Sequence, residues 1–309
     1  MKTLIVDNPL SIAHHMPEGH PEHAGRYEAV RTALKSVGPL DWAEATPCST
    51  DAVTRFHPPE HVSRVLAAAQ AAGTGLVSLD PDTHVCERSA ETALAAVGGT
   101  CMAVDHVIAD RYQAAFIASR PPGHHAEPDR AMGFCLFNMV ALGALHALDV
   151  HGLERVAIID IDVHHGNGTQ CLAETDERVF FASIHQAPLY PGTGQAHETG
   201  LNGNIVNVPM PGGTGSTAWR AALERDVLPA LRAFDPQMVF VSAGFDAHAD
   251  DPVGGFELTD EDFGWVASEL GFVARKHASA RLVAVLEGGY DCDALGRSAA
   301  CFVRALSEV

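Results

Sequence analysis

Residues able to form a metal or acid–base site gather in a few short segments. Asp160, Asp162 and His164 stand at alternate positions after the apolar run VAII (156–159). Alternate side chains of a β-strand point to the same face, so we expect these three groups to point one way. Buried carboxylates need a cation, and the trio could hold a divalent metal through Asp162 and His164, with Asp160 behind them. A buried ion pair with an arginine, or capping of the next helix, would also explain the pattern.

A three-ligand metal site needs one more side chain, and Asp246 in the segment GFDAHADDP is the candidate. Taken alone, Asp246 resembles a surface acid in a turn. Joined to Asp162 and His164, it completes three protein ligands and leaves a position open for water, as in catalytic metal sites. Two carboxylates and one imidazole suit zinc or ferrous iron and do not choose between them.

His124 and His125 are adjacent in the segment RPPGHHA (120–126), where two prolines restrict the backbone. Imidazole titrates near neutral pH, so the pair favours general acid–base catalysis, although two surface histidines would look the same. Each ring needs a partner to fix its tautomer. Asp160 and Asn167 are the candidates for this role.

Tyr290 follows Gly288 and Gly289 at the end of the last apolar run. Two glycines allow the backbone to approach a site closely, and the phenol could donate a hydrogen bond to a developing oxyanion. A packing tyrosine is the alternative. Phe134 and Tyr190 could line a narrow channel, or could serve core or loop packing.

A scaffold of alternating strands and helices would bring these segments together. Short β-branched apolar runs predict buried parallel strands at 4–6, 114–119, 156–162, 179–184, 204–208, 238–243 and 282–287. Amphipathic stretches predict helices at 60–72, 89–109, 137–149, 217–234, 259–277 and 295–306, with Thr259 and Asp262 in a capping box. The alternation predicts an α/β fold: a single-domain, doubly wound, mostly parallel sheet over residues 1–309 with helices on both faces. Ligands bind such sheets beyond the carboxyl ends of the strands, where the polar segments fall.

The composition excludes several classes of partner. The formal net charge of −19 argues against a nucleic-acid partner, because phosphate binding needs cations. No apolar stretch is long enough for a membrane span, and Asp7 interrupts the first apolar run too early for a signal peptide, so we expect a cytoplasmic protein. The seven cysteines form no CxxC pair and predict reduced thiols.

Six ordered motifs resemble the zinc-dependent histone deacetylase family, including its bacterial amidohydrolase and acetylpolyamine deacetylase relatives. The resemblance begins near HPEHAGRYEAV (20–30) and reaches the last strand. The motifs are RPPGHHAEPDRAMGFCLFN (120–138), DIDVHHGNGTQ (160–170), PGTG (191–194), NVPMPGGTG (207–215), SAGFDAHADDPVGG (242–255) and LEGGYD (286–291). The asparagine in HHGNG and the sequence PPGHHA resemble the class II branch of the family rather than class I. The implied fold is that of the arginases and deacetylases.

The resemblance implies a role for each motif residue. Zinc would be bound by Asp162, His164 and Asp246, with ferrous iron as the other possibility. His124 and His125 would be the tandem histidine pair, and Tyr290 the oxyanion-stabilising tyrosine. A structural potassium ion would lie near Asp160, Ser183 and the Ile184 carbonyl, with the backbone of Asp162 and His164 and with Asn167 close by.

The resemblance also implies a set of substrate-binding residues. Phe134, next to Gly133, and Tyr190 would form the walls of an acyl-lysine channel. In the family the second wall is commonly phenylalanine, so Tyr190 departs slightly from the pattern. Asp82 is a weaker match to a rim carboxylate, a place that Asp80 could also take. Arg26 matches an arginine near an internal cavity.

Together these observations predict a metal-dependent amidohydrolase that removes acetyl or short acyl groups from acyl-lysine peptides, proteins or small amines. They leave both a monomer and a homo-oligomer open. The histidine pair would take a proton from the attacking water and then protonate the leaving amine. An acetylpolyamine deacetylase, a binuclear arginase-like manganese hydrolase and a non-catalytic acyl-lysine binding module are the alternatives. In the polyamine-specific branch, the position that corresponds to Val253 resembles a gatekeeping glutamate. Valine supplies no charge for the second ammonium of a polyamine, so we expect acyl-lysine to be preferred over acetylpolyamines.

Overall fold

The structure, a computed structural model, describes all of residues 1–309 and is built on one large parallel sheet. The main sheet has eight strands in the order β2-β1-β5-β10-β9-β6-β7-β8. Their bounds are β1 Thr3–Asp7, β2 Asp41–Glu44, β5 Ala114–Ala118, β6 Val156–Asp160, β7 Val179–Gln186, β8 Ile205–Met210, β9 Met238–Ala243 and β10 Leu282–Leu286. A separate antiparallel hairpin joins β3 (Val77–Ser78) to β4 (His84–Val85). The central strands are fully buried between the two helical layers and are apolar except for Asp160 and Ser242 near their carboxyl ends.

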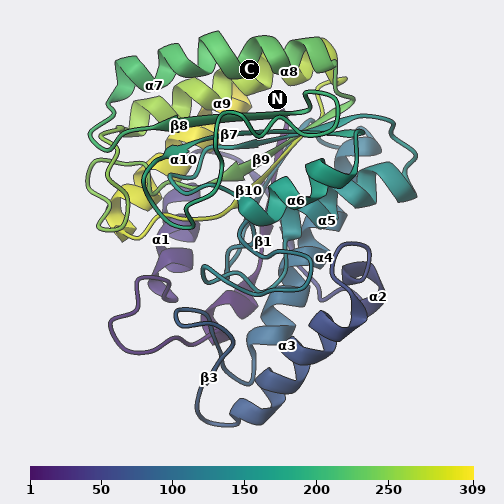
Figure 1. The fold of residues 1–309 in the computed structure, drawn as a ribbon, viewed down its shortest axis with the longest axis vertical. Helices are drawn as coiled ribbons and strands as arrows, with labels where there is room; N and C mark the ends of the chain where they lie inside the picture. Colours follow the sequence, from purple (N-terminus) through teal and green to yellow (C-terminus); the bar gives the residue numbers. More distant parts are fainter.

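The helices form a layer on each side of the sheet (Figure 1). One layer holds α1 (Gly25–Leu34), α7 (Ser216–Ala222), α8 (Leu228–Phe234), α9 (Asp260–His277) and α10 (Cys292–Glu308). The other holds α4 (Ser89–Ile108), α5 (Met139–Leu145) and α6 (Asn167–Thr175), with α2 (Thr50–Val53) and α3 (Pro59–Ala72) outside α4. A 3-10 helix, η1 (Pro9–Ala13), follows β1. Two π-helical turns, η2 (His146–Val150) and η3 (Leu223–Val227), continue α5 and α7.

The predicted fold class is confirmed, and every predicted strand is present. The edge strand β2 was missed because its sequence DWAE is mostly exposed and has no apolar run. The short hairpin and the helices α1, α2 and α6 were also missed. The predicted capping box is present at Thr259, where Asp262 caps the start of α9.

One prediction about strand geometry is wrong. Strand β6 ends at Asp160, so Asp162 and His164 lie in the loop beyond it. The Asp160 side chain accepts the backbone N–H of Asp162 at 3.1 Å, and the Asp162 side chain accepts that of His164 at 2.9 Å. These side-chain bonds replace the sheet ladder and turn the chain.

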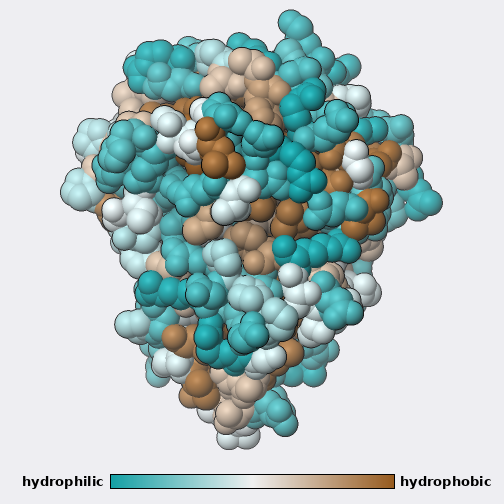
Figure 2. Space-filling model, turned by 45° about the vertical axis from the view of Figure 1, so that its right-hand side comes forward, coloured by the Kyte–Doolittle hydropathy of each residue, from teal (hydrophilic) through white to brown (hydrophobic).

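The surface carries few large apolar side chains. In Figure 2, hydrophobic residues form small groups among hydrophilic ones on the face drawn. The exposed large hydrophobic side chains come from separate parts of the chain: Ile12, Trp42, Leu76, Val150, Tyr190, Leu201 and Phe272. None of the helices combines the length and apolarity needed to cross a membrane.

Candidate metal and catalytic site

Four neighbouring strands end at one edge of the sheet and bring the sequence motifs together. Strand β10 lies between β5 and β9, and β9 pairs with β6. The loops after these strands therefore meet, although they are separated by more than a hundred residues at the extremes. This is the edge at which parallel α/β sheets bind ligands.

The three expected metal ligands lie close together at this edge: Asp162, His164 and Asp246. Nδ1 of His164 lies 3.0 Å from Oδ1 of Asp162 and 3.1 Å from Oδ2 of Asp246. The three side chains are buried, and one ligand atom from each lies within 4.8 Å of the others. Such a compact set of one imidazole and two carboxylates suits a divalent zinc-type ion.

Two glycines make room for the carboxylates. A Cβ on Gly244 would lie 2.1 Å from Oδ2 of Asp162, and one on Gly288 would lie 2.0 Å from Oδ2 of Asp246. The backbone N–H of Gly288 donates to Asp162 Oδ2 at 2.8 Å, and that of Val163 donates to Asp246 Oδ1 at 2.8 Å. Only glycine at positions 244 and 288 allows the backbone to hold the acids this closely.

The charges of the site call for a cation. Burial and the facing Asp162 carboxylate raise the pKa of Asp246 to about 7. Burial alone would lower the pKa of His164, but its hydrogen bonds to Asp162 and Asp246 raise it to about 10. The proton on His164 thus lies between two carboxylates, where a divalent ion would compensate the same charge. The residues fit a metal by charge, by ligand type and by spacing.

His124 and His125 lie side by side with different partners. Nδ1 of His124 is 2.9 Å from Oδ2 of Asp160, and Nδ1 of His125 is 2.8 Å from Oδ1 of Asn167. Asn167 in turn donates to Glu127 at 2.7 Å, which fixes its amide so that its oxygen faces His125. Nδ1 of His125 is therefore the protonated nitrogen, and its Nε2 is free to accept a proton.

The surroundings push the two histidines toward opposite charge states. Burial disfavours the cation of His124, but Asp162 and Asp160 outweigh it and raise the pKa well above its usual value. Burial lowers the pKa of His125 well below its usual value, and the nearby His124 and His164 lower it further. Neighbouring groups driven apart in this way suit separate proton-holding and proton-accepting roles.

Tyr290 is held in place from three sides. Its backbone N–H donates to Asp251 Oδ2 at 2.6 Å, and its ring packs edge-on against Phe134. The guanidinium of Arg26 lies 4.8 Å from the ring centroid on another side. Burial raises the pKa of the Tyr290 phenol well above its usual value, so the hydroxyl remains a hydrogen-bond donor.

A narrow cavity of about 160 Å³ opens onto these groups. Phe134 and Tyr190 flank it, and the Tyr190 ring lies 5.1 Å from that of His125, nearly perpendicular to it. Phe134 has a φ of 67°, a conformation that bulky residues rarely adopt outside functional sites. The full lining is Asp82, His125, Gly133, Phe134, His164, Tyr190, Val253 and Tyr290.

The structure separates residues that the sequence left as alternatives. Asp82 lines the cavity, whereas Asp80 pairs with Arg130 at 3.1 Å. Arg26 does not line the cavity: it is fully buried behind Tyr290 and donates to the Gly289 carbonyl at 2.6 Å. Its guanidinium therefore contacts the Tyr290 ring and the backbone before it, and the expected role of Arg26 in substrate binding stays a prediction.

The residues expected to hold potassium lie at the carboxyl end of β6 and on the neighbouring strand β7. Asp160 pairs in register with Ser183 on the neighbouring strand β7, and Ile184 follows in that strand. Asp160 and Ser183 are both fully buried. The side-chain oxygen of Ser183 contacts Nδ1 of His185 at 2.9 Å.

Several supporting residues were not singled out from the sequence. Glu287 is buried and accepts the backbone N–H groups of Gly123 at 2.6 Å and His124 at 3.1 Å. Asp251 accepts from the backbone at Val253 and Tyr290. Both residues lie inside the motifs quoted above. The backbone N–H groups that donate to them come from other segments or other turns, so only the three-dimensional structure identifies these bonds.

Three comparisons place these features among known proteins. The sequence matches the histone deacetylase domain over residues 20–306. It is 38% identical over 274 residues to a histone deacetylase-like amidohydrolase of Pseudomonas aeruginosa, covering 87% of this chain and 71% of that protein. It is 39% identical over 300 residues to a probable deacetylase of Methanothermobacter thermautotrophicus, covering 94% and 87%.

A solved structure agrees with the sequence comparisons. The crystal structure of the HDA15 HD domain matches with a TM-score of 0.92 at 33% identity, covering 99% of this chain and 89% of that chain. The shared sheet and the deacetylase relatives show that this chain belongs to the histone deacetylase family.

Proposed function

We propose that the protein is a single-domain, zinc-dependent deacylase that hydrolyses the amide of acyl-lysine or a similar acylated amine. The observation that carries this proposal is the narrow cavity, which ends on His125, His164 and Tyr290. A cavity of about 160 Å³ fits an extended lysine side chain with a short acyl group.

Asp162, His164 and Asp246 are the residues that would hold the metal. When bound, a divalent ion supplies Lewis acidity that activates water and polarises a carbonyl oxygen. Zinc suits the ligand set, and ferrous iron is the alternative. A potassium ion near Asp160 and Ser183 belongs to the same proposal.

His125 is the proposed general base and acid. Its Nε2 is free because Nδ1 is engaged by Asn167, and it faces the cavity, which His124 does not line. It takes a proton from the attacking water and later gives it to the amine nitrogen as the C–N bond breaks. His124, held by Asp160, retains its proton and offsets the negative charge that develops nearby.

Tyr290 is the proposed oxyanion donor. Its hydroxyl stays protonated, and Asp251, Phe134 and Arg26 restrict its position. A donor fixed in advance stabilises the charge of the tetrahedral intermediate without having to reorganise.

Acyl-lysine is the proposed substrate class, with acetylpolyamines as the second candidate. The uncharged Val253 lines the cavity and offers no partner for the extra ammonium of a polyamine. Asp82 supplies a carboxylate at the cavity for the peptide backbone of a lysine substrate. A binuclear reaction needs carboxylates that bridge two metal ions, and the segment HGNG that follows His164 contains none.

Hydrolysis of a fluorogenic acetyl-lysine peptide tests the proposal. The wild-type protein loaded with zinc should release acetate from this peptide. The variant His125→Ala should release none. Binding of the acylated peptide without hydrolysis would instead support a non-catalytic acyl-lysine binding module.

A further inference from the structure

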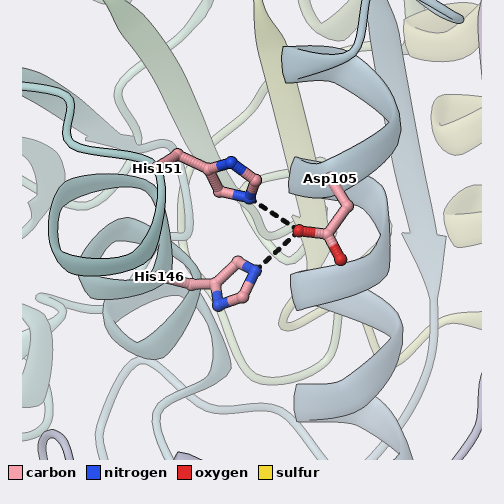
Figure 3. A group of neighbouring side chains, drawn as sticks. All are labelled: Asp105, His146 and His151. Carbon is pink, nitrogen blue, oxygen red and sulfur yellow. Dashed lines mark hydrogen bonds and ion pairs between the residues drawn. The ribbon is translucent and has the colours of Figure 1, made fainter.

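A second cluster of metal-ligating side chains joins α4 to the π-helical turn η2. Nε2 of His146 and Nε2 of His151 each lie 2.7 Å from Oδ1 of Asp105, and the two imidazoles meet nearly at right angles (Figure 3). All three ligand atoms fall within 4.8 Å of one another. Asp105 is near the end of α4, and the histidines precede β6, so the cluster is near the amino ends of the strands and away from the catalytic edge.

The π-helical turn η2 makes this cluster possible. In an α-helix at about 100° per residue, His146 and His151 would project about 140° apart. In the π turn, the backbone N–H of His151 instead bonds to the His146 carbonyl at 3.4 Å, five residues earlier. The wider turn places both rings on the side that faces Asp105, and π turns of this kind often mark functional sites.

We propose that Asp105, His146 and His151 bind a divalent transition metal ion of the zinc class, with water completing the coordination. Two imidazoles and one carboxylate form a recognised zinc ligand set. Tetrahedral ligands at about 2.0 to 2.1 Å from zinc lie about 3.3 Å from one another, so the 2.7 Å contacts need to open only slightly. The ion would join α4 to η2 as a structural clamp.

The neighbouring groups define how the site works. The exposed Arg55 donates to Nδ1 of His146 at 3.1 Å, which leaves the proton of that ring on Nε2. Metal binding at Nε2 requires this proton to move to Nδ1, so Arg55 must turn away. Asp105 and His146 themselves line a cavity of about 270 Å³, together with Arg55, Cys48 and Cys101. Neither thiol belongs to the group of ligand atoms that lie within 4.8 Å of one another, so Asp105, His146 and His151 are the proposed ligands.

Equilibrium dialysis against Zn²⁺ tests the assignment in a crossed design. The wild-type protein should bind two ions per chain, and His151→Ala and His164→Ala should each bind one, at different sites. The double variant should bind none and sets the background. His106→Ala, on α4 beside Asp105, is the matched control and should keep both ions. If His151→Ala keeps the wild-type stoichiometry, the second site is refuted, whatever happens at His164.

Two further variants guard against misfolding and sharpen the result. Asp105→Asn keeps the shape of the side chain and should weaken the second site by more than about 100-fold. Arg55→Ala removes a competing donor and a cation, and should tighten zinc binding roughly fivefold. Zinc added to protein already loaded at the catalytic site should raise the Tm by about 2 °C when free zinc is about ten times the Kd of the second site, except in Asp105→Asn. Equal zinc affinity in wild type, Asp105→Asn and Arg55→Ala would overturn the proposal.

Discussion

The two aspartate–histidine clusters use the same ligand types in opposite surroundings. The side chains of Asp162, His164 and Asp246 are 1%, 8% and 0% exposed. That of Asp105 is 54% exposed, with His146 at 13% and His151 at 24%. Water solvates the surface cluster, which is stable as a hydrogen-bonded hub, whereas the buried carboxylates depend on a cation.

The two clusters also differ in how firmly the surrounding structure fixes their side chains. Backbone N–H groups and close glycines fix Asp162 and Asp246 in place. The surface cluster has only Arg55 as a further polar neighbour of its rings. Burial and preorganisation therefore distinguish a site built for chemistry from a site suited to an exchangeable ion.

The largest effect should come from the buried ligands. We expect Asp162→Ala, His164→Ala and Asp246→Ala each to lose the catalytic metal and to lower kcat/KM by more than about 10³, because each supplies one of three ligands. Metal analysis and deacetylation kinetics measure both quantities. Asp105→Asn is the control and should keep full activity. A near-normal catalytic metal content in any of the three would remove that residue from the ligand set.

Loss of the oxyanion donor should be next in size. Tyr290→Phe should keep the metal and lower kcat by about 10² to 10³ with little change in KM, since only a transition-state contact is lost. Steady-state kinetics beside metal analysis check this, and Tyr190→Phe on the cavity wall serves as the comparison. An unchanged kcat would show that Tyr290 only packs.

A smaller loss should follow when the partner of His125 is removed. Asn167→Leu removes the acceptor that orients Nδ1, so we expect kcat to fall about 10- to 100-fold while the metal is retained. The same measurement on Cys171→Ala, further along α6, controls for disturbance of the helix. Equal rates for Asn167→Leu and wild type would mean that His125 keeps its tautomer without this bond.

Substrate choice should depend on the mouth of the buried site. The wild-type protein should prefer an acetyl-lysine peptide, and Val253→Glu should improve relative kcat/KM for acetylputrescine about tenfold by adding a carboxylate for the ammonium. Val253→Gln separates charge from size. A tenfold or greater polyamine advantage in the wild type would contradict the assignment to acyl-lysine.

The smallest effect should come from the surface cluster without metal. With chelator present, Asp105→Asn should change the free energy of unfolding by less than about 1 kcal/mol, as for exposed ion pairs. Glu22→Gln, which breaks a fully buried cluster with Arg26 and Arg120, should cost about 3 to 5 kcal/mol under the same conditions. Urea unfolding measures both. A similar loss for the two variants would erase the contrast between the clusters.

Local pattern was enough to predict much of this protein. The apolar runs at 114–119 and 238–243 became buried strands because a parallel sheet covered on both faces leaves few alternatives for such runs. The residues that could bind metal or move protons were found by their types and by their position after these strands. Period-two alternation did fail at Asp162 and His164, where side-chain bonds to the backbone end the strand.

Only the tertiary structure decided which distant groups meet. The sheet order places β10 between β5 and β9, and this brings Glu287 to the backbone of His124 and Asp251 to that of Tyr290. Packing of α4 against η2 likewise joins Asp105 to histidines 41 and 46 residues away. Such contacts depend on strand order and on a local change of helix type, which arise from packing of the whole chain and leave no periodic signal in the sequence.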